Sequence, residues 1–200
     1  MDRLAKVSDE CSRIQRDTNI PDFFPAVLHI SCDVSIKSDV DALVQMAVDK
    51  LGGIDVMVAN AGIYKTSPIL EMSDEMFDQV YAVNVKGVFH CYQAAACAMI
   101  PRGGGRIIGA CSASGKGGDL NKAAYCSSKF AVRGLSQSAA REWAKYGVTV
   151  NTYAPGPVDT DMWNKDVLGG IGESEQIRKL ASGIAPSLGH PLTIFIVDAR

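Results

Sequence analysis

The sequence has no excess of positive charge and no long apolar run. Across 200 residues, 20 Lys and Arg stand against 22 Asp and Glu, which gives a formal net charge of −2. A balanced charge provides no broad basic surface for nucleic acid. No apolar run approaches the length of a membrane span, and the residues after Met1 lack an apolar signal core. We therefore expect neither a nucleic-acid-binding nor a membrane protein.

Cysteines at metal-ligand spacing are also missing. The six cysteines are scattered and form no Cys-x-x-Cys motif. Cys32 and Cys111 stand in apolar runs, as small core residues do. This pattern argues against a disulfide framework and predicts no metal site. It favours reduced thiols and a cytoplasmic location.

The composition that is present suits one soluble globular domain, which we expect to cover residues 1–200. Apolar residues make up 47% and charged residues 21% of the chain, values usual for such a domain. Short apolar runs alternate with segments of helical periodicity. This alternation predicts an α/β fold, a doubly wound parallel sheet with helices on both faces. Strands are expected at 26–32, 54–58, 106–111 and 148–152, with a further apolar run at 192–197, and helices at 3–16, 38–51, 73–99 and 125–146.

Helix boundaries follow from individual residues. Ser38 and Ser73 are expected to cap the starts of two helices. Gly52 is expected to end the first of these helices, and Gly147 the helix at 125–146. The segment Asn84–Gly87 interrupts the long helical pattern that runs to Pro101. Within the first expected strand, His29 is predicted to be a core histidine rather than a ligand.

Polar and glycine residues follow the ends of the expected strands. Asp33, Asn60 and Ser112 each come directly after one of them, and Pro155-Gly156 follows the last. In open α/β sheets, ligands bind beyond the carboxyl ends of the strands. The sequence therefore predicts a shared site at one edge of the sheet.

Tyr125 and Lys129 stand four residues apart in an expected helix. At this spacing two side chains share a face. A lysine ammonium beside a phenol is expected to lower the tyrosine pKa from about 10, so that the phenol can exchange a proton with a carbonyl or alcohol oxygen. The hydroxyl of Ser112 could hold the same oxygen. The competing structural interpretation is a half-buried tyrosine beside a solvated lysine.

In combination, these motifs resemble the short-chain dehydrogenase/reductase family over residues 26–165. The segment Tyr125–Lys129 is similar to its Tyr-x-x-x-Lys active site. Ser112 and Asn84 match its catalytic serine and asparagine, and Asn60–Gly62 matches the Asn-Ala-Gly turn of the family. The resemblance implies a Rossmann-like fold and a nicotinamide cofactor, NAD or NADP, which carries the hydride.

The resemblance also implies a role for each matched residue. Tyr125 would be the general acid/base, and Lys129 would lower its pKa and bind the nicotinamide ribose. Ser112 would orient the substrate oxygen, and Asn84 would support a water connected to Lys129. The residues implied to contact the cofactor are Asp33, Val34, Asn60, Ala61, Gly62, Tyr125, Lys129, Pro155, Gly156, Val158 and Thr160.

Finer similarity is to the diacetyl/acetoin reductase group, carried by segments such as 55–62, 129–135 and 158–163. It implies small diketones, acyloins or vicinal diols as substrates. Trp163, within an expected mobile substrate-loop region at 159–189, would either wall the substrate pocket or pack as a surface aromatic. Partners of the family type would be further copies of the chain, in a homodimer or homotetramer.

One family feature has no counterpart in the sequence. The family opens with a strand and a Thr-Gly-x-x-x-Gly-x-Gly turn whose backbone receives the pyrophosphate. Neither Gly103–Gly105 nor Gly115–Gly118 fits this pattern or that of a P-loop. We expect a chain incomplete at both ends that keeps a three-strand core over 54–152, with 26–32 either paired to 54–58 or detached. The alternative function is a truncated, catalytically impaired isoform or fragment that only binds or dimerises.

Overall fold

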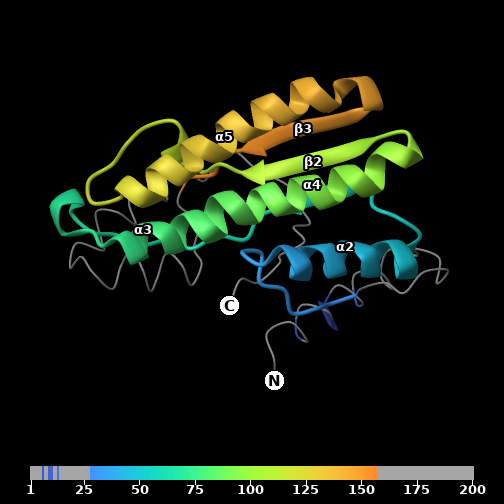
Figure 1. Ribbon diagram of the computed structural model, residues 1–200, viewed down its shortest axis with the longest axis horizontal. Helices are drawn as coiled ribbons and strands as arrows, with labels where there is room; N and C mark the ends of the chain where they lie inside the picture. The colour runs from blue at the N-terminus through green and yellow to red at the C-terminus, as the bar shows by residue number, and fades with distance from the viewer. Residues whose placement is uncertain (1–5, 7–8, 11–12, 14–27, 157–200) are drawn as a thin grey trace.

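The computed structural model of the chain describes residues 6, 9, 10, 13 and 28–156 (Figure 1). Several expectations lie outside these residues. They include the cofactor contacts at Val158 and Thr160, Trp163, the loop region 159–189, the apolar run 192–197 and most of the helix at 3–16.

The sheet of the described residues has three parallel strands (Figure 1). They are β1 (Val56–Ala59), β2 (Gly105–Ala110) and β3 (Val148–Tyr153), in the order β1-β2-β3. Arg106 of β2 lies opposite Val56 of β1 and opposite Thr149 of β3. The three-strand core predicted over 54–152 is confirmed, with boundaries shifted by one or two residues.

Within residues 28–156, four α-helices connect and flank these strands. They are α2 (Lys37–Leu51), α3 (Asp74–Tyr81), α4 (Val88–Met99) and α5 (Ala123–Trp143). A π-helical segment, Ala82–Gly87, joins α3 to α4 at the position where the sequence predicts an interruption. Short 3₁₀ turns occupy Ile69–Glu71, Ile100–Arg102, Ala113–Gly115 and Ala144–Tyr146.

The helix ends confirm most of the predicted boundaries. The Ser73 hydroxyl accepts a hydrogen bond from the Met76 N–H at 3.2 Å and so caps α3. Gly52 and Gly147 have positive φ angles of 79° and 77°, the left-handed conformation that ends a helix. The predicted cap at Ser38 is wrong. Helix α2 begins one residue earlier, at Lys37, so that Ser38 lies inside its first turn, and no side chain caps it.

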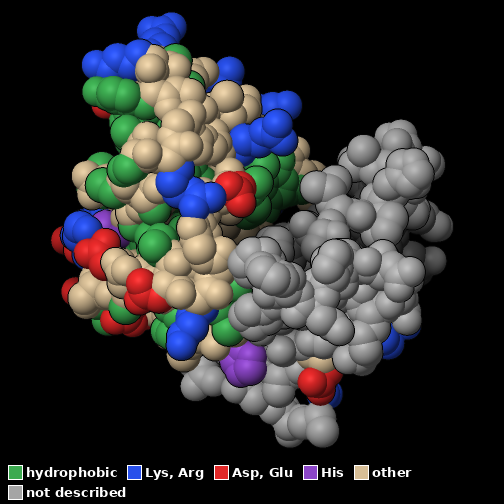
Figure 2. Space-filling model, turned by 90° about the vertical axis from the view of Figure 1, so that its right-hand side faces the viewer, with side chains coloured by type: hydrophobic (Ala, Val, Ile, Leu, Met, Phe, Trp, Pro, Cys, Tyr) green, Lys and Arg blue, Asp and Glu red, His purple; other side chains and the backbone are tan. Residues whose placement is uncertain are grey.

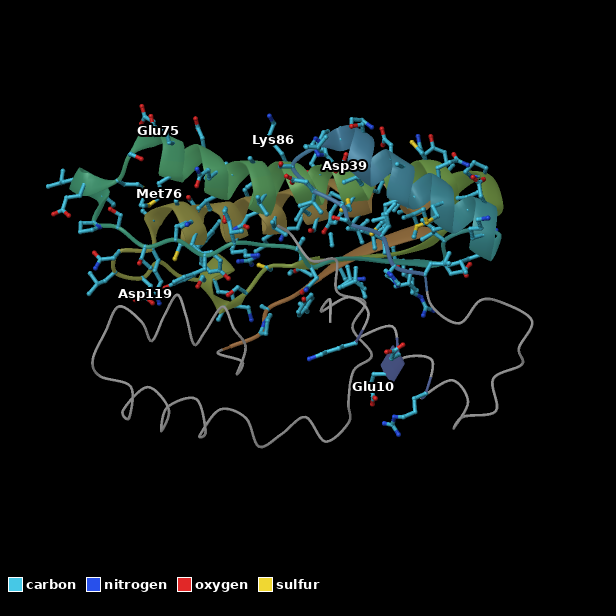
Figure 3. The ribbon with its side chains drawn as sticks, turned by 90° about the horizontal axis from the view of Figure 1, so that it is seen from below. Glu10, Asp39, Glu75, Met76, Lys86 and Asp119 are labelled. Atoms are coloured by element: carbon cyan, nitrogen blue, oxygen red, sulfur yellow. The ribbon has the colours of Figure 1, made fainter. Side chains whose placement is uncertain are left out.

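Helices α4 and α5 pack on the same face of the sheet. A Cβ atom added to Gly109 of β2 would lie 2.2 Å from the Tyr92 hydroxyl of α4 and 3.2 Å from Val132 Cγ1 of α5. Since alternate residues of a strand share a face, the buried Ile107 points the same way. Helix α2 packs against α4, and Figures 1 and 3 show these helices as one layer beside the strands.

The opposite face of the sheet is open in the described part. Val56 is 51% exposed, and Arg106, Thr149 and Asn151 are exposed as well. The described helices therefore cover one face, whereas the sequence predicts helices on both. The side of the molecule drawn in Figure 2 carries both signs of charge among its described side chains.

The segment predicted as a buried strand at 26–32 differs from the expectation. Its described residues, 28–32, form no strand, and in the described part β1 pairs with β2 alone. Pairing with 54–58 is thus wrong, and detachment from the sheet is what the structure shows. His29 is exposed rather than in the core, while Cys32 is 3% exposed and joins the core cluster. The apolar run thus predicted the burial of Cys32 correctly, but the strand that it also predicted does not form in residues 28–32.

Candidate active site

The carboxyl ends of the three strands form one connected edge. The Cys111 N–H donates to the Tyr153 carbonyl at 2.9 Å, and the Ala113 N–H donates to the Pro155 carbonyl at 2.9 Å. The Tyr153 hydroxyl donates to the Asn60 side-chain oxygen, which joins β3 to the end of β1. Asn60, Ser112 and Pro155 therefore meet at one edge, as predicted, whereas Asp33 follows no described strand.

Ser112 follows β2 in an unusual backbone conformation. Its φ and ψ angles are 61° and 159°, a region that is occupied almost only by glycine and costs other residues about 1–3 kcal/mol. Its hydroxyl accepts a hydrogen bond from the Ser114 N–H at 3.3 Å and lies near enough to Tyr125 to lower the pKa of that phenol. The strained turn thus presents the serine side chain to the tyrosine.

Tyr125 lies in the first turn of α5, in contact with a second aromatic ring. The ring of Tyr64 meets it edge-on, with centroids 4.9 Å apart and an interplanar angle of 70°. Burial raises the pKa of Tyr125 above its ordinary value of 10.0, although the nearby Ser112 hydroxyl opposes this shift. The sequence expectation of a lowered tyrosine pKa is therefore wrong for this structure.

Lys129 is buried, which excludes the interpretation as a solvated lysine. The side chain is 4% exposed, and its ammonium donates to the Ala110 carbonyl at 2.9 Å. Its Nζ lies over the face of the Tyr125 ring, 5.5 Å from the ring centroid. Burial lowers the pKa of Lys129 from 10.5 to about 8. This position explains why the ammonium does not reverse the effect of burial on the tyrosine.

Asn84 connects three segments that are distant in sequence. It is fully buried within the π-helical segment. Its Oδ1 accepts from the Ile63 N–H at 2.8 Å, and its Nδ2 donates to the Ile63 carbonyl at 3.0 Å and to the Ser128 hydroxyl at 3.1 Å. The Ser128 hydroxyl in turn donates to the Tyr125 carbonyl at 2.7 Å.

Gly62 completes this cluster. A Cβ atom at Gly62 would lie 3.2 Å from Asn84 Oδ1 and 3.5 Å from Lys129 Nζ. The glycine therefore brings the end of β1 close to both side chains. The structure brings together the four predicted catalytic residues and the Asn60–Gly62 turn.

The other predicted cofactor contacts have no hydrogen bond to the catalytic side chains among the described residues. Val34 is 1% exposed, so its side chain belongs to the core, whereas Asp33 is partly exposed. Pro155 and Gly156 follow β3 at the site edge, and Gly156 is exposed.

Sequence reasoning missed a polar group beside the tyrosine. The Lys122 ammonium lies 6.0 Å from the centroid of the Tyr64 ring and pairs with Asp119, which is labelled in Figure 3. Burial lowers the pKa of Lys122, but hydrogen bonds to Asp119 and Tyr64 and their charges outweigh it, so that the net pKa is raised. Lys122 stands three residues before Tyr125, a spacing that could have drawn attention to it.

The described residues offer neither a cluster of metal ligands nor a membrane-spanning helix. They contain no group of three or more His, Cys, Asp or Glu side chains arranged to hold a metal ion. Among them there is also no helix both long and apolar enough to cross a membrane.

Comparison with known proteins places this site in a family. The family model of short chain dehydrogenases matches residues 6–168, and the chain belongs to that family. It is 42% identical over 168 residues to an L-2,3-butanediol dehydrogenase of Corynebacterium glutamicum, covering 81% of this chain and 64% of the relative. It is also 42% identical over 134 residues to a diacetyl reductase [(S)-acetoin forming] of Staphylococcus epidermidis, covering 66% and 52%. The chain thus spans less than two thirds of the length of these relatives.

A solved structure shows the same arrangement of the chain. The gluconate 5-dehydrogenase of Burkholderia cenocepacia, in complex with NADP and tartrate, superposes with a TM-score of 0.72 at 32% identity. The match covers 82% of this chain and 62% of that one. The fold of the described residues is accordingly the Rossmann-like fold of the family.

Proposed function

We propose that this chain carries the catalytic centre of an NAD(P)-dependent oxidoreductase that interconverts a carbonyl and a secondary alcohol. The observation that supports this most is the convergence of Ser112, Tyr125 and Lys129 with Asn84 at the carboxyl edge of the sheet. Membership of the short-chain dehydrogenase family agrees with it.

Each side chain has a task that its surroundings explain. Because burial raises the Tyr125 pKa, the phenol stays protonated near neutral pH and is ready to donate its proton to a carbonyl oxygen. The Ser112 hydroxyl, which lies beside the phenol, holds the same substrate oxygen. Lys129, charged at neutral pH with a pKa of about 8, provides a fixed positive charge beside Tyr125.

The described residues fit the nicotinamide end of the cofactor. Lys129 would bind the ribose hydroxyls, and Gly62, whose Cβ atom would lie 3.5 Å from Lys129 Nζ, places no side chain beside the ammonium. Asn60, Ala61, Pro155 and Gly156 would line this end. When bound, the nicotinamide group supplies or accepts the hydride. NAD and NADP remain alternatives.

For the substrate, we infer small diketones, acyloins or vicinal diols. The support is the sequence similarity to the diacetyl/acetoin reductase group and to two relatives, a butanediol dehydrogenase and a diacetyl reductase. Lys122 and Tyr64, beside Tyr125, are placed to contact a second substrate oxygen.

Assembly into a homodimer or homotetramer in the cytoplasm is part of the same proposal. Helices α4 and α5 each carry an exposed phenylalanine on their outer side, Phe89 at 41% and Phe130 at 44%. Exposed aromatic side chains on two long helices suit contact with a second copy of the chain.

The test is oxidation of NADH or NADPH by the purified chain with diacetyl or acetoin. We expect Tyr125→Phe to lower kcat by at least roughly 100-fold, the usual contribution of a general acid. Tyr146→Phe, at a tyrosine that is 43% exposed, is the matched control and should leave kcat unchanged. If neither cofactor is oxidised and calorimetry detects no cofactor binding, the alternative of a non-catalytic binding module is favoured.

A further inference from the structure

A buried histidine outside the catalytic cluster holds the turn at Asp33 and Val34. His90, near the start of α4, is 9% exposed, and its Nδ1 lies 2.9 Å from the Val34 carbonyl oxygen. Since a carbonyl oxygen can only accept a hydrogen bond, Nδ1 carries the proton and donates it. None of the roles proposed for the catalytic residues uses this histidine.

Val34 is held from a second direction by Gly87, the last residue of the π-helical segment. A Cβ atom at Gly87 would lie 2.6 Å from Val34 Cγ2 and 3.0 Å from Val34 Cβ. Val34 itself is 1% exposed. Its side chain and its carbonyl group are thus both fixed by the segment Gly87–His90.

The turn is also ordered by its own hydrogen bonds. Asp33 Oδ1 accepts from the Ser35 N–H at 2.9 Å and from the Ser35 hydroxyl at 2.7 Å. The Asp33 N–H donates to Asp39 Oδ2 at 3.1 Å, and the Asp33 carbonyl accepts from the Ile36 N–H at 3.0 Å. These bonds all lie within residues 33–39. The bond from His90 is the polar link that attaches the turn to α4.

The turn and the catalytic cluster contact the same stretch of chain. Gly87 and His90 follow Asn84 by three and six residues, and Asn84 contacts Ile63 beyond the end of β1. The π-helical segment and the start of α4 therefore touch the catalytic cluster at Asn84 and the turn at Val34. An extended ligand along residues 84–90 could reach both.

From this geometry we infer that His90 is a positioning residue for the adenine end of the cofactor. It acts through Val34: by fixing the Val34 carbonyl it holds the partly exposed Asp33 where an adenosine group can reach it. The inference rests on the proposed function, together with the cofactor contacts at Asp33 and Val34 that the family resemblance implies. Neither the family match nor the relatives' names assign a role to His90.

The test compares two halves of the cofactor as probes. ADP-ribose carries the adenine end, and nicotinamide mononucleotide carries the other end. Calorimetry measures the Kd of each for the full chain and for two variants. We expect His90→Leu, which removes the donor and leaves the Val34 carbonyl unpaired, to weaken ADP-ribose binding roughly tenfold. His90→Asn, which retains an N–H donor near the Nδ1 position, should stay within about twofold. Nicotinamide mononucleotide should bind all three proteins equally.

His29→Leu is the matched control, because His29 is exposed on the chain segment that leads to the same turn. It should change neither Kd. Gly87→Ala gives an independent perturbation, since its Cβ atom would displace Val34. It should weaken the binding of ADP-ribose but not that of nicotinamide mononucleotide. It takes the place of His90→Leu in the test if that variant does not fold.

Equal weakening of both probes by His90→Leu, no change for ADP-ribose, or no ADP-ribose binding by the unmodified chain would overturn the inference. The proposed function is measured separately, by hydride transfer to diacetyl. It can therefore stand when the role of His90 fails, and its own failure is seen in turnover.

Discussion

At the scale of single residues, Lys129 is the group whose environment departs most from water. The residue is 4% exposed, and its ammonium donates to the Ala110 carbonyl. A carbonyl hydrogen bond compensates only part of the loss of hydration of an ammonium, and a buried cation therefore becomes easier to deprotonate. The lowered pKa of about 8 reflects the free-energy cost of burying the ammonium beside Tyr125.

This cost makes stability depend on pH in a defined direction. The folded pKa of Lys129 is about 8 and the unfolded value is 10.5. Between these values the unfolded chain binds a proton that the folded chain does not, so the free energy of unfolding rises with pH. We expect the difference between the chain and Lys129→Met to change by about 2 kcal/mol from pH 7.5 to 9.5 in favour of the chain, measured by urea unfolding.

The difference between the two proteins is the quantity to follow, because other groups titrate in the same range. Burial raises the pKa values of Cys32 and Cys91, so both thiols stay protonated when folded and lower stability as pH rises. They are the same in both proteins and cancel. A flat difference across this range would show that Lys129 is not desolvated as described.

At the scale of elements, the contact between β2 and its two covering helices depends on Gly109. The Tyr92 hydroxyl lies over this residue and cannot withdraw freely, because it is bonded to the Ser136 hydroxyl at 2.7 Å. The Ser136 hydroxyl donates its own proton to the Val132 carbonyl at 2.7 Å, so that Tyr92 is the donor to Ser136. The absence of a side chain at Gly109 is therefore what allows α4, α5 and β2 to approach one another.

We expect Gly109→Ala to destabilise the fold by about 1–3 kcal/mol, the usual cost of overpacking a close contact. Its Cβ atom would lie 2.2 Å from the Tyr92 hydroxyl oxygen. Thermal or urea unfolding measures the change. Gly134→Ala, in α5 with no heavy atom within 4 Å of the added Cβ, is the control and should stabilise by about 0.5–1 kcal/mol through helix propensity.

A double-mutant cycle tests the stated cause. Combining Gly109→Ala with Tyr92→Phe removes the hydroxyl that the new methyl group would meet. The cost of the alanine should then be smaller than in the presence of Tyr92. An unchanged cost would place the clash elsewhere.

At the scale of the whole molecule, local signals predicted the catalytic half well. Apolar runs bounded by glycine marked the three strands, and the Asn84–Gly87 interruption marked the π-helical segment. The order of the motifs along the chain, and the rule that ligands bind beyond the carboxyl ends of parallel strands, were enough to predict a shared site for Asn84, Ser112, Tyr125 and Lys129.

What the sequence did not predict depends on three-dimensional surroundings. Residues 28–32 have strand-like composition, but strand formation requires a neighbour, and the described part provides none. The direction of the Tyr125 pKa shift depends on burial and on where the Lys129 ammonium points, which spacing alone does not fix. Tyr64 and His90 carry no motif, and their contacts appear only once distant segments are placed together.

Asn84 is the residue through which these distant segments are joined. Its three side-chain hydrogen bonds link Ile63, beyond β1, to Ser128 in α5. Asn84→Leu keeps the approximate volume but leaves the Ile63 peptide groups and the Ser128 hydroxyl without these partners. At about 1 kcal/mol for each lost bond, we expect a loss of about 2–4 kcal/mol in the free energy of unfolding by urea.

Ser128→Ala removes two bonds, the one accepted from Asn84 and the one donated to the Tyr125 carbonyl, and should cost about 1–2 kcal/mol. Asn151→Leu, at an exposed asparagine of β3, should cost less than either. The order of the three variants is the decisive result. If Asn84→Leu costs no more than Ser128→Ala, the two bonds to Ile63 contribute no more than the single bond from Ser128 to the Tyr125 carbonyl. The catalytic edge would then be held mainly by the strand-end bonds: Cys111 to Tyr153, Ala113 to Pro155, and Tyr153 to Asn60.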